Sequence, residues 1–162
     1  FQTDTDDFLG IIENKTDIQI PETIDNIIKY IDNISNYEFN QKFHKYSSKK
    51  VNGKTLREQH LDIIPSHNVK IYKTKYIGFG YSDFKFFINS IINDISSINK
   101  NKNFRQNDII NQWTKIDRSY IFSIKLEFKV SSGFYIRQFV RDLSNKFNFP
   151  MTVYDINRIN MS

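Results

Sequence analysis

The stretch YIFSIKLEFKVSSGFYIRQFVRDLSNKF, from Tyr120 to Phe147, decides the fold of this chain. Its first part carries an apolar side chain at every second position, which predicts a β-strand with one buried face from Tyr120 to Val130. Gly133 then marks a turn, and apolar residues at helical spacing predict an amphipathic helix from Tyr135 to Phe147. A strand that passes through a tight turn into a helix is a junction at which we expect a functional site.

Three further elements precede this stretch. Isoleucines at helical spacing predict a helix from Ile20 to Ile34, with Pro21 suited to its first turn. The segment from Asn40 to Arg57 is basic and contains a turn at Gly53, which is typical of an exposed loop. A strand is predicted from Val69 to Phe79.

The segment from Asp83 to Asp117 separates the two predicted strands. It is predicted to be helical, with an apolar stripe, a polar loop from Asn99 to Asn103, and a second short helix from Asp108 to Lys115. The stripe consists of Phe84, Ile88, Ile91, Ile92, Ile95 and Ile98. After the last helix, Met151 to Ile159 is predicted to be extended. These elements predict an α/β fold of the α+β type, in which helices flank a mixed, largely antiparallel sheet.

Composition limits the classes of protein to consider. A chain of 162 residues fits one domain, and its net charge of +5 permits a polyanionic partner. Without cysteine there is neither a disulfide nor a cysteine zinc site, and His44, His60 and His67 lack metal-ligand spacing, so we expect no metal. No apolar run approaches the roughly 20 residues that span a bilayer, so we expect no membrane partner.

Three ordered blocks carry a resemblance to a known family. They are TDTDDFLG (Thr3 to Gly10), YSSKKVNGKTL (Tyr46 to Leu56) and GFYIRQFVRDL (Gly133 to Leu143). Together they resemble the TruB-type tRNA pseudouridine synthases, which isomerise a uridine of the tRNA T-arm. The resemblance implies a pseudouridine-synthase-like fold, an isomerase activity without cofactor, and the T-arm of tRNA as the partner.

The resemblance also implies that part of the family's catalytic domain lies outside this sequence. The family carries its nucleophilic aspartate in a Gly-x-Leu-Asp-Pro stretch upstream of the Thr-Asp-Thr segment. We therefore expect residues 1–162 to be a partial catalytic domain without the N-terminal strands, inactive alone, with a helical insertion at 83–117 outside the catalytic scaffold. The family's small C-terminal RNA-binding domain is not matched either.

Three residues match catalytic positions of the family. Tyr135 resembles the tyrosine that stacks on the target uracil and is a candidate proton acceptor at C5. Arg137 resembles the arginine that pairs with the nucleophilic aspartate, a role that suits a guanidinium because it stays charged and binds a carboxylate through two nitrogens. Asp7 matches an aspartate of the network around that arginine, whereas Asp4 and Asp6 are predicted to form an exposed acidic turn. Read alone, Tyr135 and Arg137 are an aromatic residue and a surface cation at the start of a helix.

The second block is predicted to contact RNA. Lys50 and Lys54 lie on the turn around Gly53, where their charges would hold phosphate groups without reading sequence. Taken alone, such a basic loop is a solvated surface. Lys42 and Phe43 replace the Ile-Pro that the family usually has here, which predicts a different entry to the loop.

The C-terminal segment aligns with the family's Leu-Arg-Arg-Leu stretch. By this alignment Ile156 covers the flipped base and Arg158 is the retained one of two RNA-binding arginines. The alternative for Ile156 is an ordinary core residue.

A second function remains open. A member of the family that had lost its nucleophile would be a non-catalytic RNA-binding or ribonucleoprotein scaffold protein. Asp7 and Arg137 argue against it, because an arginine left without a carboxylate partner in a closed pocket is costly. We expect a monomer, and the sequence leaves the compartment open.

Overall fold

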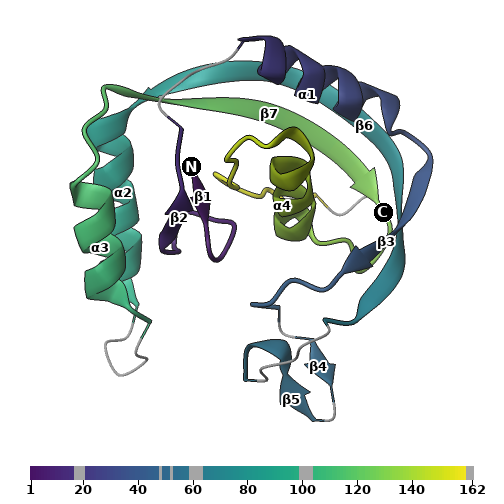
Figure 1. Cartoon of the computed structure of the whole chain (residues 1–162), viewed down its shortest axis with the longest axis horizontal. Helices are drawn as coiled ribbons and strands as arrows, with labels where there is room; N and C mark the ends of the chain where they lie inside the picture. The colour runs from purple at the N-terminus through teal and green to yellow at the C-terminus, as the bar shows by residue number, and fades with distance from the viewer. Residues whose placement is uncertain (17–20, 48, 52, 59–63, 99–103, 160–162) are drawn as a thin grey trace.

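The computed structural model describes residues 1–16, 21–47, 49–51, 53–58, 64–98 and 104–159 (Figure 1). Along the chain the elements are β1 (Gln2–Thr3), β2 (Ile12–Asn14), α1 (Pro21–Asn33), β3 (Tyr37–Lys42), β4 (Lys50–Val51), β5 (Lys54–Thr55), a 3₁₀ turn (Leu56–Glu58), β6 (Ser66–Asp83), α2 (Phe84–Ser97), α3 (Gln106–Thr114), β7 (Tyr120–Val130) and α4 (Ile136–Phe147). Within these residues the strand pairs β1–β2, β3–β6, β4–β5 and β6–β7 are all antiparallel. The predicted α+β class is confirmed.

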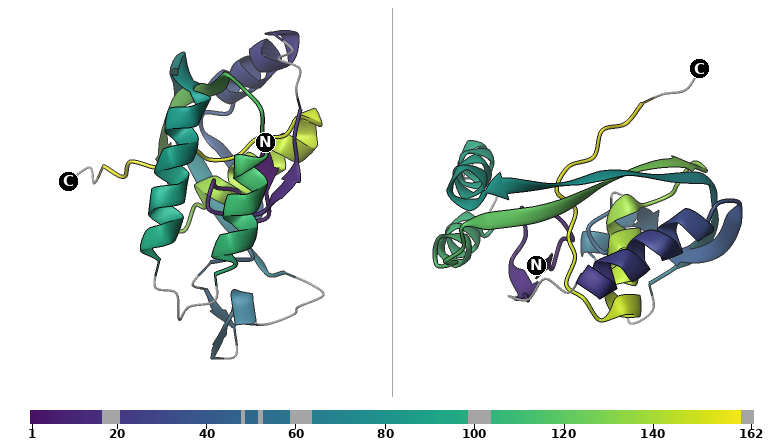
Figure 2. Two further views of the ribbon diagram at one scale, coloured as in Figure 1. Left: turned by 90° about the vertical axis from the view of Figure 1, so that its left-hand side faces the viewer. Right: turned by 90° about the horizontal axis from the view of Figure 1, so that it is seen from above.

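Strands β6 and β7 form a long, curved antiparallel pair at the centre of the fold. We call this pair the β6–β7 hairpin, although α2 and α3 connect its two strands. Its register runs from Ile71 opposite Val130 to Asp83 opposite Tyr120, and β3 pairs with the other edge of β6. Seen from above, α1 and α4 lie together on one side of this sheet (Figure 2). The predicted strand from Tyr120 to Val130 is confirmed with the same bounds, and the predicted Val69–Phe79 strand lies inside the longer β6.

The hairpin buries opposite faces at its two ends. At one end, Leu126, Phe128 and Val130 of β7 pack on a core built from α1, α4 and Ile71. At the other end, Ile121 enters the core formed by α2 and α3. Its side chain lies on the opposite face of β7 from those of Leu126, Phe128 and Val130. Because of this change of face, Tyr120 stays 63% exposed. The prediction of one buried face along all of β7 is therefore wrong at its first residues.

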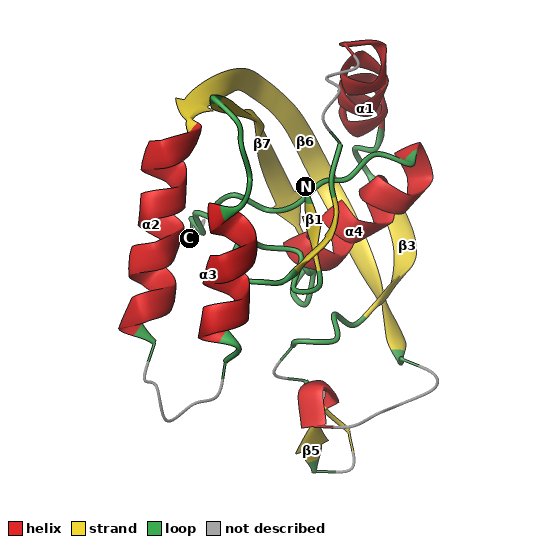
Figure 3. Cartoon of the chain, turned by 60° about the vertical axis from the view of Figure 1, so that its left-hand side comes forward, coloured by secondary structure: helices red, strands yellow, loops and turns green. Residues whose placement is uncertain are grey.

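The helices α2 and α3 stand side by side beyond the end of the hairpin (Figure 3). Of the predicted stripe, Phe84, Ile88, Ile91 and Ile95 are buried, whereas Ile92 and Ile98 are only partly buried; Phe87 of α2 and Ile109 and Trp113 of α3 are buried as well. Asp83 caps α2 by accepting a hydrogen bond from the backbone N–H of Phe86 at 2.9 Å. The same cluster includes Phe8, next to Asp7, so the prediction that this segment lies outside the scaffold is wrong: it packs directly on the first block.

The remaining predictions concern the ends of elements and the loops. Helix α1 agrees with the predicted helix from Pro21 onward, while Ile20 and the loop Asn99–Asn103 lie outside the described residues. The turn at Gly53 joins β4 to β5 with a φ of 80°, a left-handed conformation that favours glycine. The C-terminal segment is extended; Val153 forms an isolated bridge with Asp7, and the hydroxyl of Thr152 lies 3.5 Å from that of Thr3 in β1.

Candidate active site

The first block folds into a tightly closed loop. Asp4 ties its two ends together, because its N–H donates to the carbonyl of Ile11 at 2.9 Å and its Oδ1 accepts from the N–H of Ile11 at 2.8 Å. Gly10 lies against Thr5, and a Cβ atom at this position would come within 2.2 Å of the Thr5 hydroxyl. Only glycine fits at position 10 without a shift of its neighbours.

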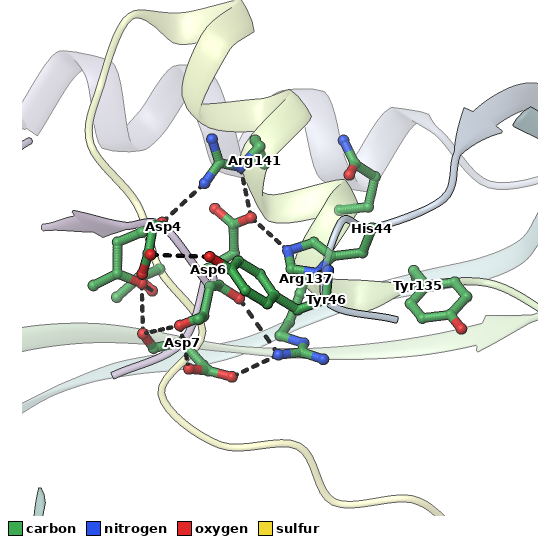
Figure 4. A network of polar contacts seen from close by, with 12 residues as sticks. Asp4, Asp6, Asp7, His44, Tyr46, Tyr135, Arg137 and Arg141 are labelled. Atoms are coloured by element: carbon green, nitrogen blue, oxygen red, sulfur yellow. Dashed lines mark hydrogen bonds and ion pairs between the residues drawn. The ribbon is translucent and has the colours of Figure 1, made fainter. Parts of the chain in front are cut away.

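This loop orients the carboxylate of Asp7. Its Oδ1 accepts hydrogen bonds from the Thr5 hydroxyl at 2.7 Å and from the N–H of Leu9 at 3.1 Å. Its Oδ2 is left to face Arg137, whose Nη1 donates to it at 2.8 Å from the first turn of α4 (Figure 4). The structure therefore brings together two predicted catalytic residues that lie 130 positions apart.

Arg137 keeps donors available for a further partner. Its hydrogen bonds within the described residues, to Asp7 and to the carbonyl of Thr5 at 3.4 Å, both use Nη1. A guanidinium has five N–H donors in a fixed fork, so the other edge of Arg137 retains the geometry to bind a second carboxylate through two nitrogens. Its side chain is 27% exposed, which leaves that edge accessible.

Tyr135 is fixed through its backbone. The buried side chain of Gln41 accepts from the Tyr135 N–H at 2.9 Å and donates to its carbonyl at 3.1 Å. The ring meets Phe43 edge to face with centroids 6.3 Å apart, and Phe43 stacks on His67 at 4.1 Å. Figure 4 shows the Tyr135 ring to one side of the polar network. Phe43 stands where the family that the chain resembles usually has proline. The stacked rings of Phe43 and His67 thus form a wall beside the Tyr135 ring.

Asp6 is the centre of a buried network that the sequence did not predict. Its carboxylate is fully buried, and its Oδ2 contacts Nε2 of His44 at 2.8 Å and Nε of Arg141 at 2.6 Å. Burial opposes the charge of Arg141, but the hydrogen bonds and negative charges of Asp6 and Glu13 together outweigh it and raise the pKa of Arg141 above its ordinary value. The prediction of an exposed acidic turn is wrong for Asp6, because His44 and Arg141 cover it.

Asp4 is also less exposed than predicted. Its Oδ2 accepts from Nη1 of Arg105 at 2.6 Å and from the hydroxyl of Tyr46 at 3.1 Å. Burial disfavours the ionised carboxylate, yet these hydrogen bonds, that of Ile11 and the charge of Arg105 together lower the pKa of Asp4 below its usual value. Asp4 thus links the first block to the second block and to the connection between α2 and α3.

The predicted RNA-binding lysines lie on a separate hairpin. Lys50 in β4 and Lys54 in β5 are exposed, and Figure 1 shows this hairpin away from α4. The buried side chain of Leu56 and its N–H, which donates to the carbonyl of Lys49 at 3.0 Å, anchor the hairpin. Lys49 lies 5.0 Å from the centre of the Phe43 ring and so connects the hairpin with the wall beside Tyr135. The prediction of an exposed, basic loop is confirmed around Gly53. It is wrong for the start of the Asn40 to Arg57 segment, where β3 extends to Lys42 and the side chains of Gln41, Phe43, His44 and Ser47 are buried.

The predicted C-terminal residues lie on the extended segment. Ile156 is 37% exposed and Arg158 is exposed. The structure brings neither into the network around Asp7, although Val153 on the same segment donates its N–H to the carbonyl of Asp6 at 2.9 Å. Ile156 is thus not a core residue, which leaves it accessible to a ligand.

One of the residues that sequence reasoning missed had a detectable signal, and two did not. Arg141 follows Arg137 by one helical turn, so both are expected on one face of α4. Gln41 stands in a strand and is buried, but its sequence context gives no hint of the backbone of Tyr135 as its partner. Nor does the context of His44 indicate that it meets Asp6.

Comparison with other proteins gives no further information, since no family model and no curated protein matches the chain. Among the residues described, no three His, Asp or Glu side chains gather as ligands of a metal ion would. None of the helices in the same residues is long and apolar enough to cross a bilayer.

Proposed function

We propose that this chain is part of a TruB-type tRNA pseudouridine synthase that isomerises a T-arm uridine. The observation that carries the proposal is the 2.8 Å ion pair between Asp7 and Arg137. Each residue belongs to a different block of the resemblance, and their pairing is what the resemblance implies for the network around the catalytic arginine. An exposed turn and an unrelated surface cation have no reason to meet in this way.

The geometry supports a division of roles. Asp7 is held by Thr5 and Leu9, so it fixes one edge of the Arg137 guanidinium. The other edge would keep the nucleophilic aspartate ionised and oriented as it attacks the flipped uridine. Tyr135, two residues before Arg137, supplies an aromatic ring at the same helix start for stacking on the uracil and for accepting the C5 proton. No cofactor takes part, because one glycosidic bond is broken and remade within the site.

The RNA is held at a distance from the reacting base. Lys50 and Lys54 on the β4–β5 hairpin would bind T-arm phosphates, and Arg158 with Ile156 would approach from the C-terminal segment. Lysine charges on such a hairpin position RNA without reading its sequence.

The test is tritium release from tRNA labelled at C5 of its uridines, with the protein encoded by the whole open reading frame that contains Phe1–Ser162. Wild-type protein should release tritium, and Arg137→Gln should reduce kcat by about 10²-fold or more, in the range of lost electrostatic stabilisation. Glu38→Gln, which alters an exposed ion pair, is the control and should keep full activity.

Two outcomes would count against the proposal in different ways. Absence of tritium release from wild-type protein that still binds tRNA would favour the non-catalytic RNA-binding protein. Full activity of Arg137→Gln would remove the assigned role of the Asp7–Arg137 pair.

A further inference from the structure

One face of the β6–β7 hairpin carries a concentration of exposed lysines. Lys73 lies directly opposite Lys129, Lys75 opposite Glu127, and Lys125 opposite a glycine of β6. All four lysines and the glutamate are exposed. We refer to this surface, defined by the four lysines, as the lysine face.

The lysine face is turned away from α1 and α4. Leu126, Phe128 and Val130 point to those helices, and the alternating residues Lys125, Glu127 and Lys129 therefore point to the opposite side of the sheet. Figure 2 shows α1 and α4 on one side of the sheet only. The register thus places a row of cations on an exposed surface of the curved sheet.

The charges on this face are not balanced within the chain. Four lysines against Glu127 leave a local charge of +3, and Lys73 faces Lys129 directly across the two strands. Like charges in directly opposed positions destabilise a sheet. Such an arrangement is explained by an anionic partner that neutralises it.

Small residues continue the same face and leave room for a close approach. Gly78, Gly80 and Ser123 follow Lys125 along the hairpin in the register. A Cβ atom on Gly80 would meet only the Ser123 hydroxyl at 3.9 Å, so internal packing does not require glycine there. Glycine inside a strand marks a bulge or a position where a ligand or another backbone comes close. Gly78 lies at an irregularity of the β6–β7 register, whereas Gly80 does not.

We propose that the lysine face binds the phosphate backbone of RNA, as a contact surface separate from the β4–β5 hairpin. Lysine acts as a point charge on phosphate, and the four residue steps from Lys125 to Lys129 span roughly 13 Å of strand, enough for several successive phosphates. The positions of β7 from Lys125 to Lys129 on this face carry Lys, Glu and Lys. The exposed apolar side chains in the same part of β6, Tyr72 and Ile77, lie five residues apart at the two irregularities of the register, so they do not form the clustered apolar anchor that a protein interface or a membrane-binding surface uses. The inference extends the proposed function, whose substrate is a folded RNA.

The test measures binding of the chain to a fluorescent T-arm hairpin RNA by anisotropy between 50 and 200 mM salt. In the test variant, Lys73, Lys75, Lys125 and Lys129 are all changed to Gln. A matched control variant carries Lys→Gln at four exposed positions elsewhere, Lys15, Lys29, Lys85 and Lys115, and has the same net charge.

Each lost phosphate contact lowers the slope of log K against log salt by about 0.7 to 0.9, so the slope of the test variant should fall by about 3. Over this fourfold change of salt, wild-type affinity should then drop about 60-fold more than that of the test variant. The control variant should keep the wild-type slope.

A second variant separates binding from folding. Lys73→Glu replaces the like-charge pair with an opposite-charge pair, so it should raise the Tm while it weakens RNA binding. Unfolding cannot produce that combination.

Several results would overturn the inference. One is an unchanged slope in the test variant, and another is an equal loss in the control variant. A third is that the test variant loses binding to phosphatidylserine vesicles but keeps the wild-type slope of RNA affinity against salt, which would assign the lysine face to a membrane surface. Each is independent of tritium release, so the proposed isomerase can fail while the lysine face stands, and the reverse.

Discussion

Asp6→Asn is the most informative single perturbation of the buried network. In the wild-type protein Oδ2 of Asp6 contacts His44 and Arg141 at 2.8 and 2.6 Å, with no exposure of the Asp6 side chain. Asparagine keeps the shape and one acceptor oxygen but removes the charge. The guanidinium of Arg141 then loses its buried counter-charge.

The size of the effect follows from burial. Removing one partner of a buried ion pair costs about 3–5 kcal/mol, and Arg141 is 28% exposed and keeps the carbonyl of Thr3 and the carboxylate of Glu13 as acceptors. We therefore expect Asp6→Asn to lower the free energy of unfolding by about 3 kcal/mol, at the lower end of that range. With a urea m-value of about 2 kcal/mol/M, the midpoint of unfolding should move down by about 1.5 M.

The assay is urea unfolding followed by circular dichroism, with Glu38→Gln as the matched control. Glu38 and Lys70 form an ion pair of 2.8 Å, the same length as the contact between Asp6 and His44, but their side chains are 68% and 35% exposed. That variant should leave the midpoint of unfolding nearly unchanged, because solvent screens an exposed ion pair. If Asp6→Asn also costs no more than the control, burial does not set the strength of the network and the reasoning is refuted.

Three further predictions follow from the same loop. Arg137→Lys keeps the charge but cannot bind two carboxylates in one plane, so kcat in the tritium-release assay should fall while the Tm, measured by circular dichroism, stays within a few degrees. In the folded wild-type protein the pKa of Asp4 is lowered, so its ionised carboxylate adds stability that Asp4→Asn lacks. This contribution is fully present above the ordinary pKa of 3.8 and is lost as pH falls below that value. Urea unfolding should therefore show a larger difference in the free energy of unfolding between wild type and Asp4→Asn at pH 7 than at pH 3. Gly10→Ala places a Cβ within 2.2 Å of a neighbouring hydroxyl and 2.7 Å of the Asp4 carboxylate, so it should cost about 1–3 kcal/mol in urea unfolding, whereas Gly80→Ala, with its nearest atom at 3.9 Å, should cost less.

The regular elements were predictable because their sequence patterns are long. Periodicity gave the bounds of β7 correctly and those of α1, α2 and α4 to within a residue or so. The six-residue strand β3, Tyr37–Lys42, has no such pattern, since its burial depends on one edge of β6 and on Gln41 holding Tyr135. The short strands β1 and β2, of two and three residues, form the stem of the Asp4–Ile11 loop.

The candidate site was predictable only in part, for a different physical reason. Asp7 and Arg137 were found together because each belongs to a block of the resemblance. Asp6 and Arg141 lie 135 positions apart, and periodicity does not report contacts at that distance. Local pattern therefore places acidic residues in a turn, while burial of the turn depends on side chains that arrive from elsewhere in the chain.

The helices α2 and α3 show how a segment that resembles an insertion shapes the site. Phe8 is 8% exposed, with its ring 4.5 Å from that of Phe87 and 5.3 Å from that of Trp113. Asp7, the next residue back, presents its carboxylate to Arg137 on the other side of the loop. The loop is thus held between a hydrophobic contact with α2 and α3 and an ion pair with α4, in addition to its own Asp4–Ile11 hydrogen bonds. The position of the Asp7 carboxylate consequently depends on packing in α2 and α3 as well as on the blocks that carry the resemblance.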